Sequence, residues 1–250
     1  MSKIQNRRAI IGIIGLGYVG LPLALAFAEK GFTVKGFDVD FKKVDAINRG
    51  ESYISYINAT RIRKVLKSKK ISATDDFSRL GEPDVIIICV PTPLTPQRDP
   101  DMSYIVNTTA QIKTCLRTGQ LVVLESTTYP GTTEELVKDR LEKTGLICGR
   151  DFFLAFSPER EDPGNPTFYT TNIPKIVGGV DQDSGDLAEA LYEKVIKKTV
   201  RVVNARTAEA VKLTENIFRA VNIAMVNELK IIYERMNIDV WDVLDAASTK

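Results

Sequence analysis

The chain has 250 residues, a length that suits one large domain or one domain followed by the beginning of another. Hydrophobic residues make up 44% of it, which is enough for a core, and its net charge of +2 (34 basic minus 32 acidic side chains) argues against a polybasic surface for nucleic acid or membrane. No apolar run approaches the length of a membrane span, and the N-terminus lacks the apolar region of a signal peptide. We therefore expect a cytoplasmic protein that acts on a small molecule.

Three cysteines, Cys89, Cys115 and Cys148, lie far apart in the sequence, and there is no histidine. Their spacing is not that of metal ligands, so the composition excludes a zinc site and histidine-based acid–base catalysis, and we expect no metal. Cys89 closes an apolar run at residues 85–90. We interpret all three cysteines as small buried hydrophobic residues rather than nucleophiles.

The N-terminal region is organised around a glycine turn. Residues 10–14 form an apolar, β-branched run that predicts a buried parallel strand, and an apolar helix is expected at residues 21–29. Between them the Gly-x-Gly-x-x-Gly pattern permits a tight turn, close approach of the backbone to a pyrophosphate, and close packing of helix on strand. The free N–H groups at the start of the helix would face the anion. Such a turn alone is also compatible with a purely structural role, but this context favours dinucleotide binding through Gly15, Gly17, Tyr18, Val19 and Gly20.

A second apolar strand at residues 33–37 ends at Asp38. This is the distance past the glycines at which an acidic residue binds the adenosine ribose. Its carboxylate would repel a 2′-phosphate, so the sequence predicts NAD rather than NADP as the cofactor. Lys43 follows on the next helix, where a phosphate contact and a solvated surface charge are equally compatible with the pattern.

Strands and helices alternate along the rest of the first 205 residues. This alternation predicts an α/β fold, a Rossmann-like doubly wound parallel sheet, for residues 1–205. Further strands are expected at 71–74, 84–90, 121–124, 152–156, 175–178 and 199–203, and further helices at 42–48, 61–68, 103–115 and 184–196.

Three loops that follow strands carry polar groups. In a parallel sheet ligands lie beyond the carboxyl ends of the strands, so Thr92 and Thr127 are expected at the binding edge, although hydroxyls also serve as turn and cap residues. The third loop, residues 157–165, carries four charges in a short turn that includes Glu159. So many charges beside a dinucleotide site favour a functional role over a solvated loop.

From residue 207 to about residue 236 the sequence lacks glycine and proline and predicts one long helix. Lys212, Asn216 and Arg219 share one face of it, and apolar residues cluster on the other side. We therefore expect residues 206–250 to begin a central helical domain, whose long helix packs against other elements or forms a homodimer.

Five motifs together resemble the UDP-glucose/GDP-mannose dehydrogenase family, most closely its UDP-N-acetylhexosamine 6-dehydrogenases. They occur in the family's order over essentially the whole chain, which is far more specific than one glycine fingerprint. The motifs are residues 15–22, 90–93, 125–133, 157–165 and 212–216.

The resemblance implies NAD-dependent oxidation of the C6 hydroxyl of a UDP-sugar, which we expect to be a UDP-N-acetylhexosamine, to the uronate for surface polysaccharide precursors. In such enzymes a cysteine thiolate captures the intermediate aldehyde, and the resulting thioester is hydrolysed. The resemblance implies that Asp38 and Lys43 bind the adenosine ribose side of NAD and that Thr92 lines the cofactor. It implies that Thr127 and Glu159 serve both cofactor binding and catalysis. Lys212 and Asn216 would stabilise the oxyanion.

One departure from the family pattern concerns the nucleophile. The family places it in a Gly-Gly-His-Cys type loop after the long helix, whereas this sequence has no cysteine after Cys148. We therefore expect the NAD-binding half of such an enzyme, without its nucleotide-sugar domain and inactive by itself. Two alternatives remain: an NAD-binding and dimerisation module without catalysis, and a hydroxyacid or 6-phosphogluconate-type dehydrogenase that uses a helical lysine.

Overall fold

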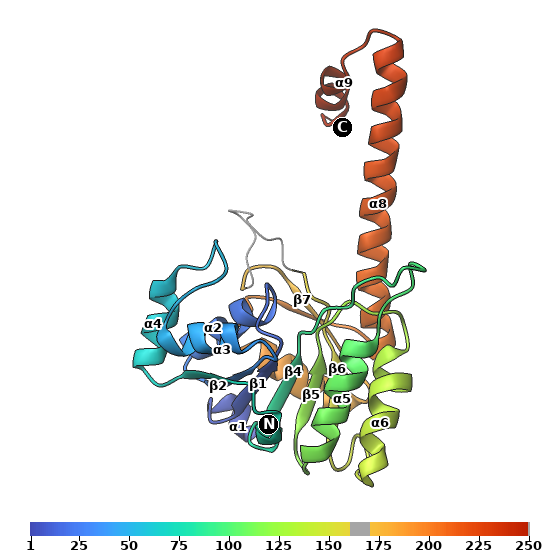
Figure 1. Ribbon diagram of the computed structural model, residues 1–250. Helices are drawn as coiled ribbons and strands as arrows, with labels where there is room; N and C mark the ends of the chain where they lie inside the picture. Colours follow the sequence, from blue (N-terminus) through green and yellow to red (C-terminus); the bar gives the residue numbers. More distant parts are fainter. Residues whose placement is uncertain (161–170, 250) are drawn as a thin grey trace. The chain divides into compact units, whose positions relative to one another are not determined.

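The structure is a computed structural model that describes residues 1–160 and 171–249 (Figure 1). The chain divides into two compact units, Met1–Ala210 and Val211–Lys250. The strands of the first unit are β1 (Ile10–Ile14), β2 (Thr33–Phe37), β3 (Ile71–Thr74), β4 (Val85–Ile88), β5 (Leu121–Leu124), β6 (Phe153–Phe156), β7 (Lys175–Gly179) and β8 (Thr199–Arg201). Its α-helices are α1 (Ser2–Gln5), α2 (Gly20–Glu29), α3 (Phe41–Arg49), α4 (Ala59–Lys67), α5 (Ser103–Cys115), α6 (Asp139–Leu141) and α7 (Gln182–Tyr192).

The strands form one sheet in the order β3-β2-β1-β4-β5-β6-β7-β8, and β1 to β6 are parallel. This confirms the predicted Rossmann-like fold, in which the strand order reverses between β1 and β4 and leaves a crevice at their carboxyl ends. The sheet is not parallel throughout, because β7 pairs antiparallel with β6 at Ala155↔Gly179. β8 is again parallel to β7.

Helices cover both faces of the sheet, as near-continuous apolar strands require. Helix α2 is buried over nearly its whole length, and its Phe27 packs edge-on against Phe32 and tilted against Tyr192 of α7, with centroid distances of 5.6 and 6.4 Å. Helices α2 and α7 therefore share one face, while α5 and α6 lie side by side (Figure 1). The buried Ile, Val, Leu and Phe side chains between these layers form the core of the first unit.

Local sequence explains where several helices begin and end. Asp40 and Asn58 cap α3 and α4 by accepting hydrogen bonds from backbone amides two residues on. Gly50 ends α3 in a left-handed conformation. The segment that follows the loop after β5 is a π-helix, Thr132–Lys138.

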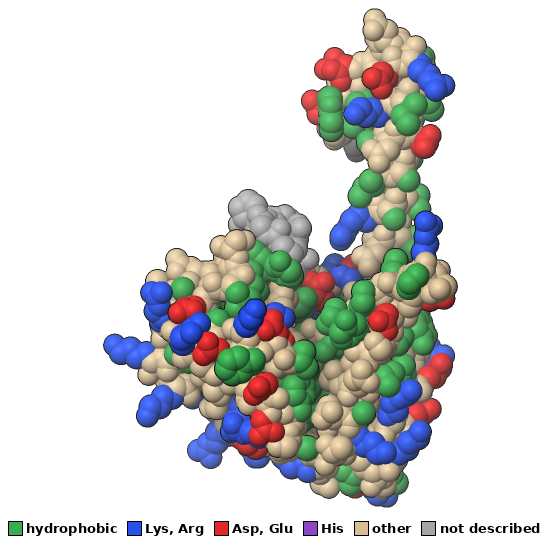
Figure 2. All heavy atoms as spheres, viewed as in Figure 1, with side chains coloured by type: hydrophobic (Ala, Val, Ile, Leu, Met, Phe, Trp, Pro, Cys, Tyr) green, Lys and Arg blue, Asp and Glu red, His purple; other side chains and the backbone are tan. Residues whose placement is uncertain are grey.

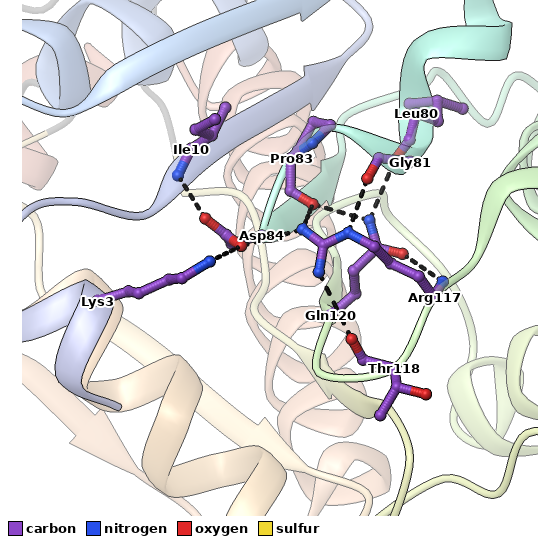
Figure 3. A network of polar contacts seen from close by, with 9 residues as sticks. All are labelled: Lys3, Ile10, Leu80, Gly81, Pro83, Asp84, Arg117, Thr118 and Gln120. Atoms are coloured by element: carbon purple, nitrogen blue, oxygen red, sulfur yellow. Dashed lines mark hydrogen bonds and ion pairs between the residues drawn. The ribbon is translucent and has the colours of Figure 1, made fainter.

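A polar network lies at the amino ends of the central strands, opposite their carboxyl ends (Figure 3). Asp84 accepts hydrogen bonds from Lys3 at 2.7 Å, from the Ile10 amide at 3.0 Å and from Arg117 at 3.0 Å. Arg117 and Gln120 also donate to backbone carbonyls of residues 80–83, at 2.7–3.1 Å. The network joins the starts of β1, β4 and β5 to the N-terminal helix.

Helix α8 (Ala205–Arg235) begins in the first unit and continues in the second, which also contains α9 (Val240–Ala247). The predicted long helix is thus present, and it begins two residues earlier than expected because Asn204 accepts a hydrogen bond from the Thr207 amide at 2.8 Å. Asp239 caps α9 through the Trp241 amide. Among the residues described, no helix is long and apolar enough to cross a membrane.

Candidate dinucleotide site

The first unit contains a cleft of about 1120 Å³ at the carboxyl ends of β1, β2, β4 and β5. Hydrophobic side chains gather around a hollow on the face of this unit that is drawn in Figure 2. The cleft collects eight of the predicted cofactor residues from five separate segments: Gly15, Gly17, Tyr18, Val19, Asp38, Lys43, Thr92 and Thr127. Glu159 also lines it.

The glycine turn has the geometry that the sequence predicts. Gly15 has φ +90°, a conformation that L side chains rarely adopt. A Cβ on Gly20 would overlap the carbonyl oxygen of Gly15, so α2 sits too close to the turn for any side chain there. At Gly17, by contrast, no atom of the described residues lies within 4 Å of the position of a Cβ. Gly17 therefore lines the cleft with no described side chain in the space that its Cβ would occupy.

Asp38 is 5% exposed and ends β2 beside the turn. Its Oδ2 accepts a hydrogen bond from the Leu16 amide at 2.8 Å, and its Oδ1 accepts one from the Asp40 amide at 2.9 Å. Lys43 forms an ion pair with the same carboxylate at 3.4 Å. Lys43 donates to the same oxygen as the Leu16 amide, so Oδ1 is the oxygen that keeps a second lone pair for a ribose hydroxyl.

The two threonine loops meet at the binding edge, as their positions after β4 and β5 predict. The Thr92 hydroxyl donates a hydrogen bond to the Thr127 carbonyl at 2.7 Å, and the Ser126 hydroxyl donates to the Val90 carbonyl at 2.7 Å. These two bonds cross-link the loops. These side-chain-to-backbone hydrogen bonds therefore fix one wall of the cleft.

A buried charged group lies at the floor of the cleft. Glu125 is 1% exposed and forms an ion pair with Lys175, whose ammonium lies 5.3 Å from the centre of the Tyr192 ring. Burial raises the pKa of Glu125, although the neighbouring ammonium opposes this. The Cys89 thiol donates to Glu125 Oε2 at 3.6 Å, and burial together with that carboxylate raises the pKa of Cys89. Cys89 is thus the buried, unreactive thiol that the sequence predicts.

The other two cysteines are less buried than expected. Cys115 and Cys148 are only partly buried. Cys115 ends α5, where its thiol approaches the Ser78 carbonyl at 3.3 Å, and Cys148 lies in a turn 4.0 Å from Asp181. Burial and that carboxylate raise the pKa of Cys148 to about 12. The prediction of burial was wrong for both residues, because Cys115 is the last residue of α5 and Cys148 lies in a turn, whereas Cys89 directly follows the central strand β4.

The charged loop after β6 is described only in its first part. Glu159 lies beside the floor of the cleft, where it and Arg160 line a smaller cavity together with Glu125 and Lys175. Arg160 donates to the Pro174 carbonyl at 2.8 Å and so joins this loop to the start of β7. Residues 161–165 of the predicted motif lie outside the described part of the chain.

The remaining two predicted catalytic residues belong to the second unit. Lys212 and Asn216 are one turn apart on α8, as their spacing predicts, and Lys212 is buried. The cleft itself is lined by residues of the first unit.

Several residues at the site were not singled out from the sequence. Glu125 directly follows β5, and Lys175 is the first residue of β7. The apolar pattern that predicts a strand does not single out a charged residue at its end. Glu209 is fully buried at the start of α8 and accepts hydrogen bonds from the amides of Gly131 and Thr133 at 2.6 and 2.8 Å. It anchors the threonine loop after β5, and only tertiary contact across more than 70 residues reveals it.

The fold and the cleft define a dinucleotide-binding domain of the dehydrogenase class. Residues 9–196 match the NAD binding domain, and residues 206–250 the central domain, of the UDP-glucose/GDP-mannose dehydrogenase family. The chain belongs to this family, and NAD is its cofactor.

Individual members of the family are similar to this chain over nearly its whole length. It is 39% identical to UDP-N-acetyl-D-mannosamine dehydrogenase of Pyrococcus horikoshii, over 96% of this chain and 57% of that protein. It is 38% identical to UDP-N-acetyl-D-glucosamine 6-dehydrogenase of Pseudomonas aeruginosa, over 96% of this chain and 56% of the relative. The solved structure of a UDP-D-ManNAc dehydrogenase from Pyrococcus horikoshii superposes with a TM-score of 0.90 at 39% identity and covers 96% of this chain and 57% of that one. The chain therefore spans a little over half the length of these relatives.

The cleft fits NAD on its own geometry. The space beside Gly17 leaves room for a pyrophosphate at the start of α2. Fewer amides are free there than the sequence predicts, because Leu21 donates to the Gly17 carbonyl at 3.1 Å, Leu23 donates to the Val19 carbonyl at 3.3 Å, and Pro22 has no N–H. The carboxylate of Asp38 lies where the ribose of the adenosine would be held. NAD would supply a hydride acceptor here, and the residues that would hold it are those of the glycine turn, Asp38 and the two threonine loops.

Proposed function

We propose that the full-length protein oxidises the C6 hydroxyl of a UDP-N-acetylhexosamine to the carboxylate. The oxidation consumes one water and reduces two molecules of NAD. The observation that carries the proposal is the combination of an NAD cleft with family relatives named as UDP-N-acetylmannosamine and UDP-N-acetylglucosamine dehydrogenases. A uronate of this kind would serve as a precursor of surface polysaccharide, and the cytoplasmic location expected from the sequence fits that supply role.

Four residues are proposed to act on the substrate. Thr127 and Glu159 line the cofactor cleft, where a hydroxyl can orient the sugar and a carboxylate can take a proton from water. Lys212 and Asn216 project from one face of α8, so an ammonium and an amide can donate to one oxygen that gains negative charge. Asp38, Lys43 and Thr92 are proposed to bind NAD.

The proposal is tested with the full-length protein, NAD and purified UDP-sugars. We expect two molecules of NADH per molecule of UDP-N-acetylmannosamine or UDP-N-acetylglucosamine, followed by NADH absorbance. Lys212→Ala should lower turnover about a hundredfold to a thousandfold with little change in NAD affinity. Lys230→Ala, an exposed lysine of the same helix, is the matched control. Normal turnover of Lys212→Ala, or oxidation of none of the UDP-sugars by a protein that binds NAD, would overturn the assignment.

We further propose that the second unit forms a homodimer. Six of its large apolar side chains are 40–71% exposed along α8, and Figure 2 shows hydrophobic atoms on its surface: Leu213, Ile217, Phe218, Val221, Ile223 and Met225. An exposed apolar surface of this extent is typical of an interface. Light scattering of the full-length protein should give twice the subunit mass, and Ile217→Asp should shift it toward the monomer. A full-length protein that remains monomeric would show that another segment of the chain covers this face.

A further inference from the structure

Residues 52–57 connect α3 to α4 and lie against the glycine turn. Two isoleucines anchor the segment in the core, since Ile54 is 5% and Ile57 is 4% exposed. The Ser52 hydroxyl donates to the Ile54 carbonyl at 3.0 Å, which fixes the local turn. With residues 54 and 57 anchored in the core, residues 53 and 56 contact the glycine turn.

Those two residues are tyrosines, and both donate hydrogen bonds to carbonyls of the glycine turn. The Tyr53 hydroxyl donates to the Leu16 carbonyl at 2.5 Å, and the Tyr56 hydroxyl donates to the Tyr18 carbonyl at 3.3 Å. The ring of Tyr56 also stacks on that of Tyr18, with centroids 6.3 Å apart and planes 21° apart. The carbonyls on either side of Gly17, those of Leu16 and Tyr18, thus both have phenolic partners.

The same turn is held from its other side by Asp38, whose Oδ2 accepts from the Leu16 amide at 2.8 Å. Both polar groups of Leu16 are therefore fixed, directly before the open backbone of Gly17. Burial and the carboxylates of Asp38 and Asp40 raise the pKa of Tyr53, so its hydroxyl stays protonated and remains a donor.

We propose that Tyr53 and Tyr56 are positioning residues that hold the glycine turn in the conformation that binds the NAD pyrophosphate. A peptide whose carbonyl is hydrogen-bonded keeps its orientation, so the amides of Gly17 and Val19, which share peptides with those two carbonyls, are held in place. Since no described atom outside its chain neighbours lies within 4 Å of where a Gly17 Cβ would be, the side-chain hydrogen bonds to the flanking peptides add a restraint that packing on that side does not supply. Fixing a loop in its bound conformation raises affinity because less ordering remains to be done on binding.

The test uses Tyr53→Phe, Tyr56→Phe and the double variant, which keep the rings and remove only the hydroxyls. Calorimetry should show NAD binding weakened about three- to tenfold by Tyr53→Phe, and further in the double variant. Binding of adenosine, which lacks the pyrophosphate, should stay within about twofold of wild type. Hydrogen exchange at the amides of residues 16–20 should become faster in the free variants. Tyr233→Phe, in the second unit, is the control.

These measurements distinguish a positioning role of the two tyrosines from a general loss of folded structure. They also test that role independently of the proposed oxidation. They require only NAD binding, so they do not depend on which sugar is oxidised or on whether any is. An unchanged NAD affinity in the double variant would overturn the proposal, as would an equal loss for NAD and adenosine. Selective loss of NAD affinity together with faster exchange at residues 16–20 would support it.

Discussion

Thr92 and Thr127 come from loops 35 residues apart, and the hydroxyl of one donates to the carbonyl of the other at 2.7 Å. Thr92→Val keeps the shape of the side chain and removes this bond. We expect a loss of about 0.5–1.5 kcal/mol in unfolding free energy and a few-fold weaker NAD binding, because the wall of the cleft is less fixed. Denaturant titration and calorimetry measure the two effects.

The control for this variant is Thr144→Val. The Thr144 hydroxyl also donates to a backbone carbonyl, that of Leu141 at 2.7 Å, and neither residue lines the cleft. A change in NAD affinity as large in Thr144→Val as in Thr92→Val would contradict the assignment of Thr92 to the cofactor.

Two glycines of the turn, Gly17 and Gly20, should separate binding from folding. Gly17→Ala adds a methyl group where no described atom lies within 4 Å, so stability should change by less than about 1 kcal/mol while NAD binding falls tenfold or more. Gly20→Ala places its methyl group on the Gly15 carbonyl and should destabilise the fold itself. Thermal unfolding with and without NAD distinguishes them, and a Gly17→Ala protein that binds NAD normally would refute the pyrophosphate assignment.

Asp38 should select NAD over NADP. Its buried carboxylate lies at the ribose end of the cleft, and repulsion of a 2′-phosphate at contact distance amounts to a few kcal/mol at an effective dielectric constant of about 20. We expect at least about tenfold tighter binding of NAD in calorimetry with both cofactors. Equal affinities would rule out this role of Asp38.

The Asp84 network in Figure 3 should make stability pH-dependent in acid. Burial acts to raise the pKa of Asp84, but hydrogen bonds from Lys3, the Ile10 amide and Arg117 outweigh it and hold the pKa below its usual value. A depressed pKa means that the stabilisation is fully present above the unfolded-state value of about 3.9 and is lost as pH falls through the folded-state value. Asp84→Asn should cost about 1.5–3 kcal/mol at pH 7, and the difference from wild type should shrink below about pH 4. A difference that does not vary with pH would show that the carboxylate charge is not what stabilises the network.

Replacing one member of the buried Glu125–Lys175 pair should lower the free energy of unfolding far more than replacing both. Lys175→Met leaves a buried carboxylate without its partner and should cost about 3–5 kcal/mol, whereas Lys175→Met combined with Glu125→Gln should recover much of the loss. Arg49→Met, which breaks an ion pair whose partners are 58% and 38% exposed, should cost about 1 kcal/mol or less. Urea unfolding of the wild type, of Lys175→Met, of Glu125→Gln and of the double variant gives the coupling energy of the pair. Additive losses in unfolding free energy would contradict the pairing.

The sequence by itself determined the strands, the long helix and the glycine turn. β-branched apolar runs such as residues 10–14 and 121–124 allow few alternatives to a buried parallel strand, and glycine at positions 15 and 20 follows from local geometry and from the packing of one helix on its own strand. The meeting of Thr92 with Thr127 was also predictable, because carboxyl ends of parallel strands share one edge.

Only the tertiary structure decided which side chains complete the cleft. The antiparallel return of β7 brings Lys175 to Glu125, the start of α8 brings Glu209 to the loop after β5, and the connection between α3 and α4 brings Tyr53 to Leu16. Each of these pairs joins residues 37 to 78 positions apart through side chains with no local pattern of their own. Hydrophobic periodicity fixes the face of an element, but the partner of a single polar group depends on how distant elements pack, and that information exists only in the folded chain.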